Sequence, residues 1–283
     1  MKIHLLIAAC AAIACAACNN TTGKASAGPA TDQADSTLKV DSIGCKTEDK
    51  WLDTQLGTNT SFTVDVSADY PVAGPQPLVD SIRALIATDL NLSADSAAIY
   101  GTRMMDIAAH KAMTEAHTEN FGEMGGEWTY SCKLGFSTPG LVTFNISSYQ
   151  YTGGAHGLGI TYAVTFNAET GQRLGWNIFT ADGLAALKPL VREAVSRQYF
   201  EADSWKDAAS YTWGEKFELP AMPPAFTDNG LTFYYTPYEI APYAAGKPTC
   251  TLPYSDVKPL LTPAIAELIG TTSGTPGNDT SKN

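Results

Sequence analysis

Basic residues are scarce in this sequence. It contains 18 lysines and arginines against 29 aspartates and glutamates, which gives a formal net charge of −11. Nucleic-acid phosphates are bound mainly by clustered Lys and Arg side chains, and no such cluster occurs here. The composition therefore argues against a nucleic-acid partner. It is compatible with a cationic protein as the partner.

Recognisable catalytic motifs are also missing. The Gly-x-Ser-x-Gly nucleophile elbow and the Walker loop are absent. His110 and His117 lie in a segment predicted to be helical, where seven residues span about 10.5 Å, too far for ligand distances of about 2.0–2.1 Å. Asp106 and His110 are closer, but two ligands are too few for an ion. We therefore expect no catalytic residue, metal or cofactor. Carboxylates are plentiful, so a carboxylate-dependent glycan hydrolase is the alternative.

No apolar run has the length of about 20 residues that crosses a membrane comfortably. The run Ile3–Ala17 follows Lys2 and ends in small residues, which predicts a signal peptide over residues 1–17. Its end resembles a bacterial lipobox, so Cys18 is the predicted lipid acceptor and membrane anchor. Cys15 is the competing acceptor, and an ordinary signal peptide cleaved after Ala17 is the alternative to lipidation.

Large apolar residues are nearly absent just after Cys18, where Asn19 and Asn20 begin a polar stretch. Such a composition cannot bury enough surface to fold. We predict a disordered tether over residues 18–44 and a disordered tail over residues 271–283. The Asn-rich start favours the outer membrane, with the folded part either periplasmic or surface-exposed.

Three cysteines follow the tether, an odd number for an oxidising compartment. Cys132 lies on the apolar face of a predicted strand, which indicates a buried thiol. The sequence leaves open a disulfide between Cys45 and Cys250.

The hydrophobic pattern alternates between strand and helix periods without a regular βαβ rhythm, which predicts an α+β fold. We expect antiparallel β-hairpins with packed helices in two small adjoining domains, residues 45–150 and 151–270. The predicted strands lie at 62–66, 128–136, 142–146, 160–166, 231–235 and 249–252. The predicted helices lie at 78–90, 95–120 with a weak point at Gly101, 184–195 with Thr180 or Asp182 as cap, and 255–269. In the strand 128–136, the side chains of Trp128, Tyr130, Cys132, Leu134 and Phe136 are expected on one face.

Two segments, Tyr151–Gly157 and Tyr234–Tyr243, are candidates for a binding site. In the first segment, paired glycines allow positive φ and close approach of the backbone, and His156 follows them. Tyrosines among prolines offer apolar rings with hydroxyls, which suit protein interfaces and sugar stacking. The alternative for the first segment is a tight strand-linking loop, and the alternative for the second is a packed aromatic corner. For Glu239 the alternative is a solvated carboxylate. The predicted binding residues are Tyr151, Gly153, Gly154, His156, Tyr235, Tyr238, Glu239 and Tyr243.

Several ordered motifs carry a resemblance to a family. They are Tyr151–His156, Asn167–Gly171 with Trp176–Phe179, Phe226–Leu231 and Phe233–Tyr243. Together they resemble the extracytoplasmic domain of RsiV-type anti-sigma factors, and the preceding region is more faintly similar to the accessory module of PdaC-type deacetylases. The resemblance implies a lysozyme receptor. The family's transmembrane helix and sigma-binding segment, and the deacetylase's paired aspartates and His-x-x-x-His, are not found, so only a binding role is implied.

The sequence thus predicts a cell-envelope lipoprotein with a non-catalytic binding role. The expected ligand is a lysozyme-like cationic protein or a peptidoglycan or other glycan fragment. The alternatives are the glycan hydrolase and a structural envelope protein without a small ligand.

Overall fold

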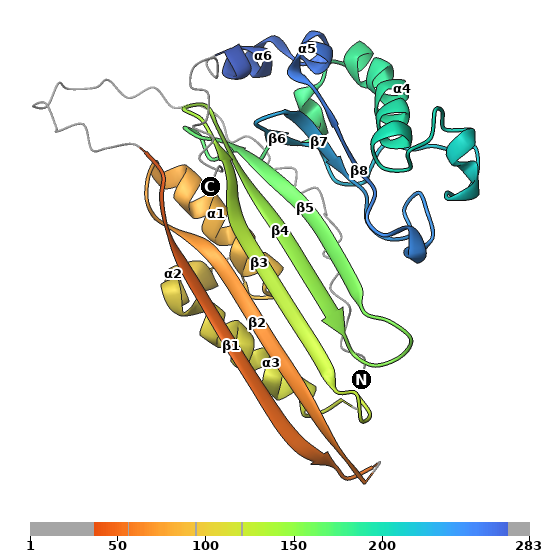
Figure 1. Ribbon diagram of the computed structural model, residues 1–283. Helices are drawn as coiled ribbons and strands as arrows, with labels where there is room; N and C mark the ends of the chain where they lie inside the picture. The colour runs from red at the N-terminus through yellow and green to blue at the C-terminus, as the bar shows by residue number, and fades with distance from the viewer. Residues whose placement is uncertain (1–36, 56, 94, 120, 271–283) are drawn as a thin grey trace, which may run out of the picture.

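The computed structural model describes residues 37–55, 57–93, 95–119 and 121–270. The predicted signal peptide, the acceptor Cys18, most of the tether and the tail lie outside the described residues. The predicted α+β class is confirmed: one five-stranded sheet and one three-stranded sheet are packed with helices (Figure 1). We call the part built on the first sheet the N-terminal module and the part built on the second sheet the C-terminal module.

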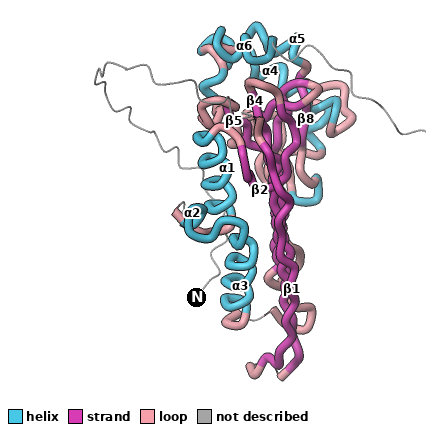
Figure 2. Tube along the Cα trace, turned by 90° about the vertical axis from the view of Figure 1, so that its left-hand side faces the viewer, coloured by secondary structure: helices cyan, strands magenta, loops and turns pink. Residues whose placement is uncertain are grey.

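The N-terminal module is a sheet with the order β1-β2-β3-β4-β5. All neighbouring strands are antiparallel except β2 and β3, which are parallel. Parallel strands need a crossover connection, and helices α1 to α3 supply it. They cover one face of the sheet, as Figure 2 shows. The bounds are β1 Lys39–Asp53, β2 Thr58–Ala73, α1 Gln76–Asp89, α2 Ser96–Tyr100, η1 Gly101–Arg103, α3 Met104–Ala116, β3 Gly126–Ser137, β4 Leu141–Tyr151 and β5 Leu158–Asn167.

The core of the N-terminal module lies between this sheet and its helices. Alternate residues of β2 point to the helical side, and Val64 and Val66 are fully buried there. The helical period of α1 brings Ile82 and Ile86 onto the same core. Cys132 in β3 is buried in it as predicted.

A largely buried carboxylate, that of Asp89, lies at the end of α1. The Tyr130 hydroxyl donates a hydrogen bond to Asp89 Oδ2 at 3.1 Å, and the Tyr162 hydroxyl donates to Oδ1 at 2.8 Å. Burial raises the pKa of Asp89 from 3.8 to about 6, although the two tyrosine hydrogen bonds and the charge of Arg173 oppose it. Burial likewise raises the pKa of both tyrosines, so each stays protonated and donates.

The C-terminal module packs a three-stranded sheet, β6-β7-β8, against helix α4. The Thr180 side chain caps α4 by accepting from the Gly183 N–H at 3.0 Å. The core includes Leu187 and Val191 of α4 and Phe233 of β7. The bounds are η2 Trp176–Ile178, α4 Ala181–Gln198, η3 Asp207–Ser210, β6 Ala225–Thr227, β7 Gly230–Tyr234, η4 Tyr243–Ala245, β8 Thr249–Leu252, α5 Tyr254–Val257, η5 Lys258–Leu260 and α6 Pro263–Gly270.

A closed cycle of hydrogen bonds joins the two sheets. The Phe226 N–H in β6 donates to Thr165 Oγ1 at 3.1 Å, and the Thr143 hydroxyl donates to the Phe226 carbonyl at 2.9 Å. The two threonine oxygens lie 2.7 Å apart. A hydroxyl has one proton, and that of Thr143 is already used, so the Thr165 hydroxyl must donate to Thr143. The cycle satisfies both backbone groups of Phe226 where water has no access.

The structure corrects two predicted boundaries. β1 begins at Lys39, inside the predicted tether, because its backbone pairs with β2 and its side chains Val40 and Ile43 pack on the core. β5 pairs with β4 along ten positions, from Leu141 with Asn167 to Gln150 with Leu158. It therefore belongs to the first sheet, and the division between the modules lies after β5 rather than at residues 150/151.

Two further predictions on local structure are wrong. A register shift between Leu134 and Phe136 in β3 turns Phe136 to the opposite face, where it packs on the core of the C-terminal module. The helix predicted over 255–269 is divided into α5, η5 and α6. Pro259 and Pro263 account for the division, since proline has no N–H to donate within a helix.

The three cysteines of the described chain are free thiols, so the structure contains no Cys45–Cys250 bridge. Cys45 lies in β1 of the first sheet, whereas Cys250 lies in β8 of the second. Within residues 37–270, as far as they are described, no helix has the length and apolar character needed to cross a membrane.

Candidate functional site

The structure brings together two of the predicted segments, the β4–β5 loop and the β7–β8 loop. The His156 ring stacks on the Tyr243 ring, with centroids 3.8 Å apart. The Tyr243 hydroxyl donates to the Gly157 carbonyl at 2.7 Å, and His156 Nδ1 lies 2.9 Å from the same oxygen. We call His156, Tyr238 and Tyr243 the aromatic patch, because Tyr238 Oη lies 3.3 Å from His156 Nε2.

The contacts of His156 define its tautomer. A carbonyl oxygen only accepts, so Nδ1 carries the proton in the bond to Gly157. In the neutral imidazole Nε2 is then an acceptor, and the Tyr238 hydroxyl donates to it. The ring is therefore held from three directions: by a stacked tyrosine, a backbone carbonyl and a second tyrosine hydroxyl.

Tyr238 adopts a backbone conformation that is unusual for its residue type. Its φ is +72°, and half of its side chain is exposed to solvent. A non-glycine residue in this region costs on the order of 1–3 kcal/mol and persists only where the surroundings hold it. Because the exposed half of the ring contributes little burial, core packing does not account for this conformation.

The carboxylate of Glu239 stabilises the β7–β8 loop that carries Tyr238. Its Oε2 accepts from the Thr236 N–H at 2.8 Å and from the Thr236 hydroxyl at 3.0 Å, while Oε1 accepts from the Ala221 N–H. Both carboxylate oxygens thus bind the protein's own backbone. Glu239 was predicted as a binding residue, with a solvated carboxylate as the alternative; in the structure its carboxylate shapes the loop that carries Tyr238.

We expect Glu239→Gln to lower the free energy of unfolding by about 1–2 kcal/mol, since one acceptor oxygen becomes an amide donor that faces another donor. Urea denaturation at pH 7 measures the change. Glu215→Gln, on an exposed side chain, is the matched control and should shift stability by less than about 0.5 kcal/mol. Equal stability of both variants would show that the Glu239 carboxylate does not hold the loop.

Other predicted site residues stabilise the fold or shape a loop. Tyr235 is 1% exposed, and its hydroxyl donates to the Glu218 carbonyl at 3.1 Å. Gly153 and Gly154 have φ of +92° and +90°, which turns the chain between β4 and β5. The Tyr151 hydroxyl closes this turn by donating to the Gly154 carbonyl at 3.0 Å. Tyr235 is therefore a core residue, whereas Tyr151, Gly153 and Gly154 shape the β4–β5 loop that carries His156.

Two exposed aromatic residues next to the patch were missed from the sequence. Tyr211 and Trp213 are 57% and 56% exposed. Trp213 Nε1 donates to the Tyr238 carbonyl at 2.9 Å, and the Trp213 N–H donates to the Ile240 carbonyl at 3.1 Å. They lie in an irregular segment without strand or helix period, so periodicity did not reveal them. A tryptophan next to a glycine in such a segment was the one available signal.

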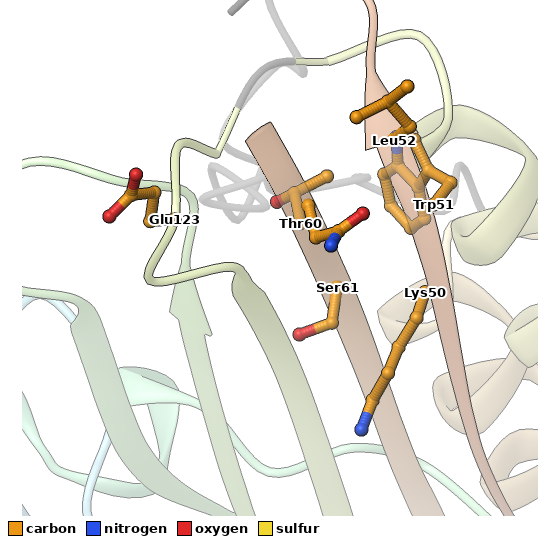
Figure 3. A pocket seen from close by; sticks show the side chains of 7 residues that line it. Lys50, Trp51, Leu52, Thr60, Ser61 and Glu123 are labelled. Carbon is orange, nitrogen blue, oxygen red and sulfur yellow. The ribbon is translucent and has the colours of Figure 1, made fainter. Parts of the chain in front are cut away.

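A separate open pocket of about 460 Å³ lies near the tip of the β1–β2 hairpin (Figure 3). No predicted site residue lines it. The Trp51 ring at its edge stacks on His117, and His117 Nε2 lies 2.8 Å from Asp49 Oδ2. The described part of the chain contains no group of three or more His, Cys, Asp or Glu side chains able to hold a metal ion. The lining side chains are Lys50, Trp51, Leu52, Asn59, Thr60, Ser61 and Glu123.

Two families match successive parts of the chain. Residues 59–159 match the family described as Deacetylase PdaC, and residues 177–255 match the Protein of unknown function family DUF3298. The matches confirm the predicted order of a PdaC-type region followed by a second domain. Neither family description names the RsiV type, so the RsiV resemblance and the lysozyme-receptor role stay predictions. No curated protein matches the chain.

Two solved structures have a similar fold. A member of the DUF3298 family from Bacteroides fragilis has a TM-score of 0.65 and 20% identity, with 83% of this chain and 98% of that chain covered. A DUF3298 family protein from Pseudomonas aeruginosa has a TM-score of 0.54 and 18% identity, with coverages of 80% and 96%. At these identities the comparison establishes the fold alone.

Proposed function

We propose that this protein is a non-catalytic binding protein of the cell envelope, anchored through a lipid on Cys18, whose aromatic patch contacts a peptidoglycan or other glycan fragment. The observation that carries the proposal is Tyr238, an exposed ring held at positive φ beside His156. Backbone strain of this kind clusters at ligand-binding sites, where a side chain must be presented in one orientation.

The chemistry of the patch suits a sugar. A tyrosine ring offers an apolar face to the C–H face of a pyranose, and its hydroxyl can exchange hydrogen bonds with sugar hydroxyls. His156 and Tyr243 are already stacked, and the Gly157 carbonyl holds both. Because these two rings are already ordered before binding, little side-chain entropy is lost when the ligand binds.

The envelope location is supported by the matched families and by the predicted leader. The PdaC and DUF3298 matches indicate a cell-envelope protein. The apolar run before Cys18 predicts export and lipidation, because it is short and ends in small residues.

A lysozyme-like cationic protein is the second candidate ligand. The observation that favours it is the formal net charge of −11, since an acidic surface attracts a basic partner. Binding to such a partner would weaken as ionic strength rises, whereas stacking on a neutral sugar would change little.

We expect Tyr238→Ala to weaken binding of soluble peptidoglycan fragments about tenfold, equivalent to about 1.4 kcal/mol. Isothermal titration calorimetry on the full-length protein, with lysozyme in a parallel titration, measures the effect. Ile99→Ala removes a 72% exposed side chain from α2 and serves as the control with unchanged affinity. Absence of saturable binding of peptidoglycan fragments by the wild-type protein would refute the glycan proposal, and lysozyme binding alone would favour the second candidate.

A further inference from the structure

Exposed aromatic rings are concentrated in one region. Among the described residues, the large apolar side chains with high exposure include three aromatic ones: Tyr211, Trp213 and Tyr238. The hydrogen bond from Trp213 Nε1 to the Tyr238 carbonyl places the indole directly beside Tyr238. Tyr211 is two residues from Trp213 in the same irregular segment, so the three exposed rings lie in one region of the C-terminal module.

The two additional rings are held firmly although they are exposed. Thr212 between them is 9% exposed and anchors the segment in the module. The Tyr211 ring lies parallel to the Phe200 ring, with centroids 6.4 Å apart and planes at 12°. The Tyr211 N–H donates to the Ala208 carbonyl at 2.9 Å. Fixed rings lose little entropy when a ligand stacks on them.

We propose that Tyr211 and Trp213 form a second sugar-stacking subsite beside Tyr238, so that the ligand is an oligosaccharide chain of at least two pyranose rings. This inference rests on the proposed glycan-binding function. The hydrogen bond from Trp213 to the Tyr238 carbonyl makes the two subsites neighbours, which a chain of linked sugars can span.

The surroundings of the rings favour a sugar chain over a protein surface. A stable protein interface buries about 1,600 Å² around a contiguous apolar centre that is depleted in charge. Here two exposed charged residues, Glu215 and Lys216, follow Trp213 closely in the chain. Separate aromatic rings with charged neighbours suit a sugar chain, in which apolar C–H faces alternate with hydroxyl groups.

The test is calorimetric titration of the full-length protein with chitooligosaccharides of one to five sugars. For the wild-type protein, we expect affinity to rise about tenfold or more between one and four sugars. Trp213→Ala should keep the affinity for one sugar within about twofold and lose the gain with length. Trp213→Phe retains a ring without the Nε1–H and should keep most of the gain, which separates stacking from support of Tyr238.

The outcomes distinguish the inference from the proposed function. If sugars bind but affinity does not change with length, or if Trp213→Ala weakens every length equally, the second subsite is overturned and the proposed function stands. If no sugar of any length binds, or lysozyme alone binds, both are overturned. Tyr238→Ala should weaken binding at every length, and Ile99→Ala should leave the whole series unchanged.

Discussion

Replacement of Asp89 by Asn is expected to stabilise the protein by up to about 3 kcal/mol at pH 7. The folded pKa of about 6 lies roughly 2 above the ordinary value of 3.8, and each pKa unit corresponds to about 1.36 kcal/mol. Above pH 6 the wild-type protein buries an ionised carboxylate, whereas Asn is neutral. Asn also keeps both tyrosine partners, because its oxygen accepts from one hydroxyl and its amide donates to the other.

The pH dependence has a defined sign. Between about pH 4 and 6 the folded state holds a proton on Asp89 that the unfolded state has released, so stability falls as pH rises. The difference in unfolding free energy between Asp89→Asn and wild type should be near zero at pH 4 and reach its full value above pH 6. Urea denaturation from pH 4 to 8 measures it, with Asp80→Asn on the exposed side of α1 as control. A difference that does not change with pH would contradict the burial of an ionisable Asp89.

Thr165→Val is expected to cost about 2–3 kcal/mol of unfolding free energy. Valine has nearly the shape of threonine but no hydroxyl, so the buried Phe226 N–H loses its acceptor and Thr143 Oγ1 loses its donor. Thr165 is 2% exposed, which leaves no room for water to replace the lost bonds. The cost should fall mainly on the junction between the modules.

A double-mutant cycle tests the closed ring of bonds. Thr143→Val should cost a similar amount, and the pair Thr143→Val with Thr165→Val should cost clearly less than the two costs added. Thr129→Val on the half-exposed face of β3 is the control, expected within about 0.5 kcal/mol of wild type. Strict additivity of the two single costs would show that the hydroxyls act independently.

Local patterns predicted most elements of the fold. Alternation located β2, β3, β4 and β5, and helical spacing located α1 and α4, because each buries one face against a core. Local patterns could not predict the parallel pairing of β2 with β3, because three helices separate these strands in the chain. The bulge before Phe136 was missed because one unpaired residue leaves the alternation of residue types unchanged while reversing the side.

Only part of the candidate site could be predicted from the sequence. The segments around His156 and Tyr238 were identified by composition, and the structure places these two side chains in contact. Composition did not distinguish Tyr235, which is buried, from Tyr238, which is exposed, because both follow β7 in one tyrosine-rich run. Tyr238 differs by its positive φ, in a loop whose backbone is hydrogen-bonded to Glu239 and Trp213.

The hydroxyl cycle also has a consequence for the order of assembly. Thr143 and Thr165 become neighbours only when β4 and β5 have paired, and Phe226 follows Thr165 by 61 residues. If the chain emerges from the export channel with its N-terminus first, the first sheet can thus be complete before β6 emerges. We expect the finished face of that sheet over β4 and β5 to act as the template on which the β6–β7 hairpin docks, so that the later half of the chain matures on the earlier half.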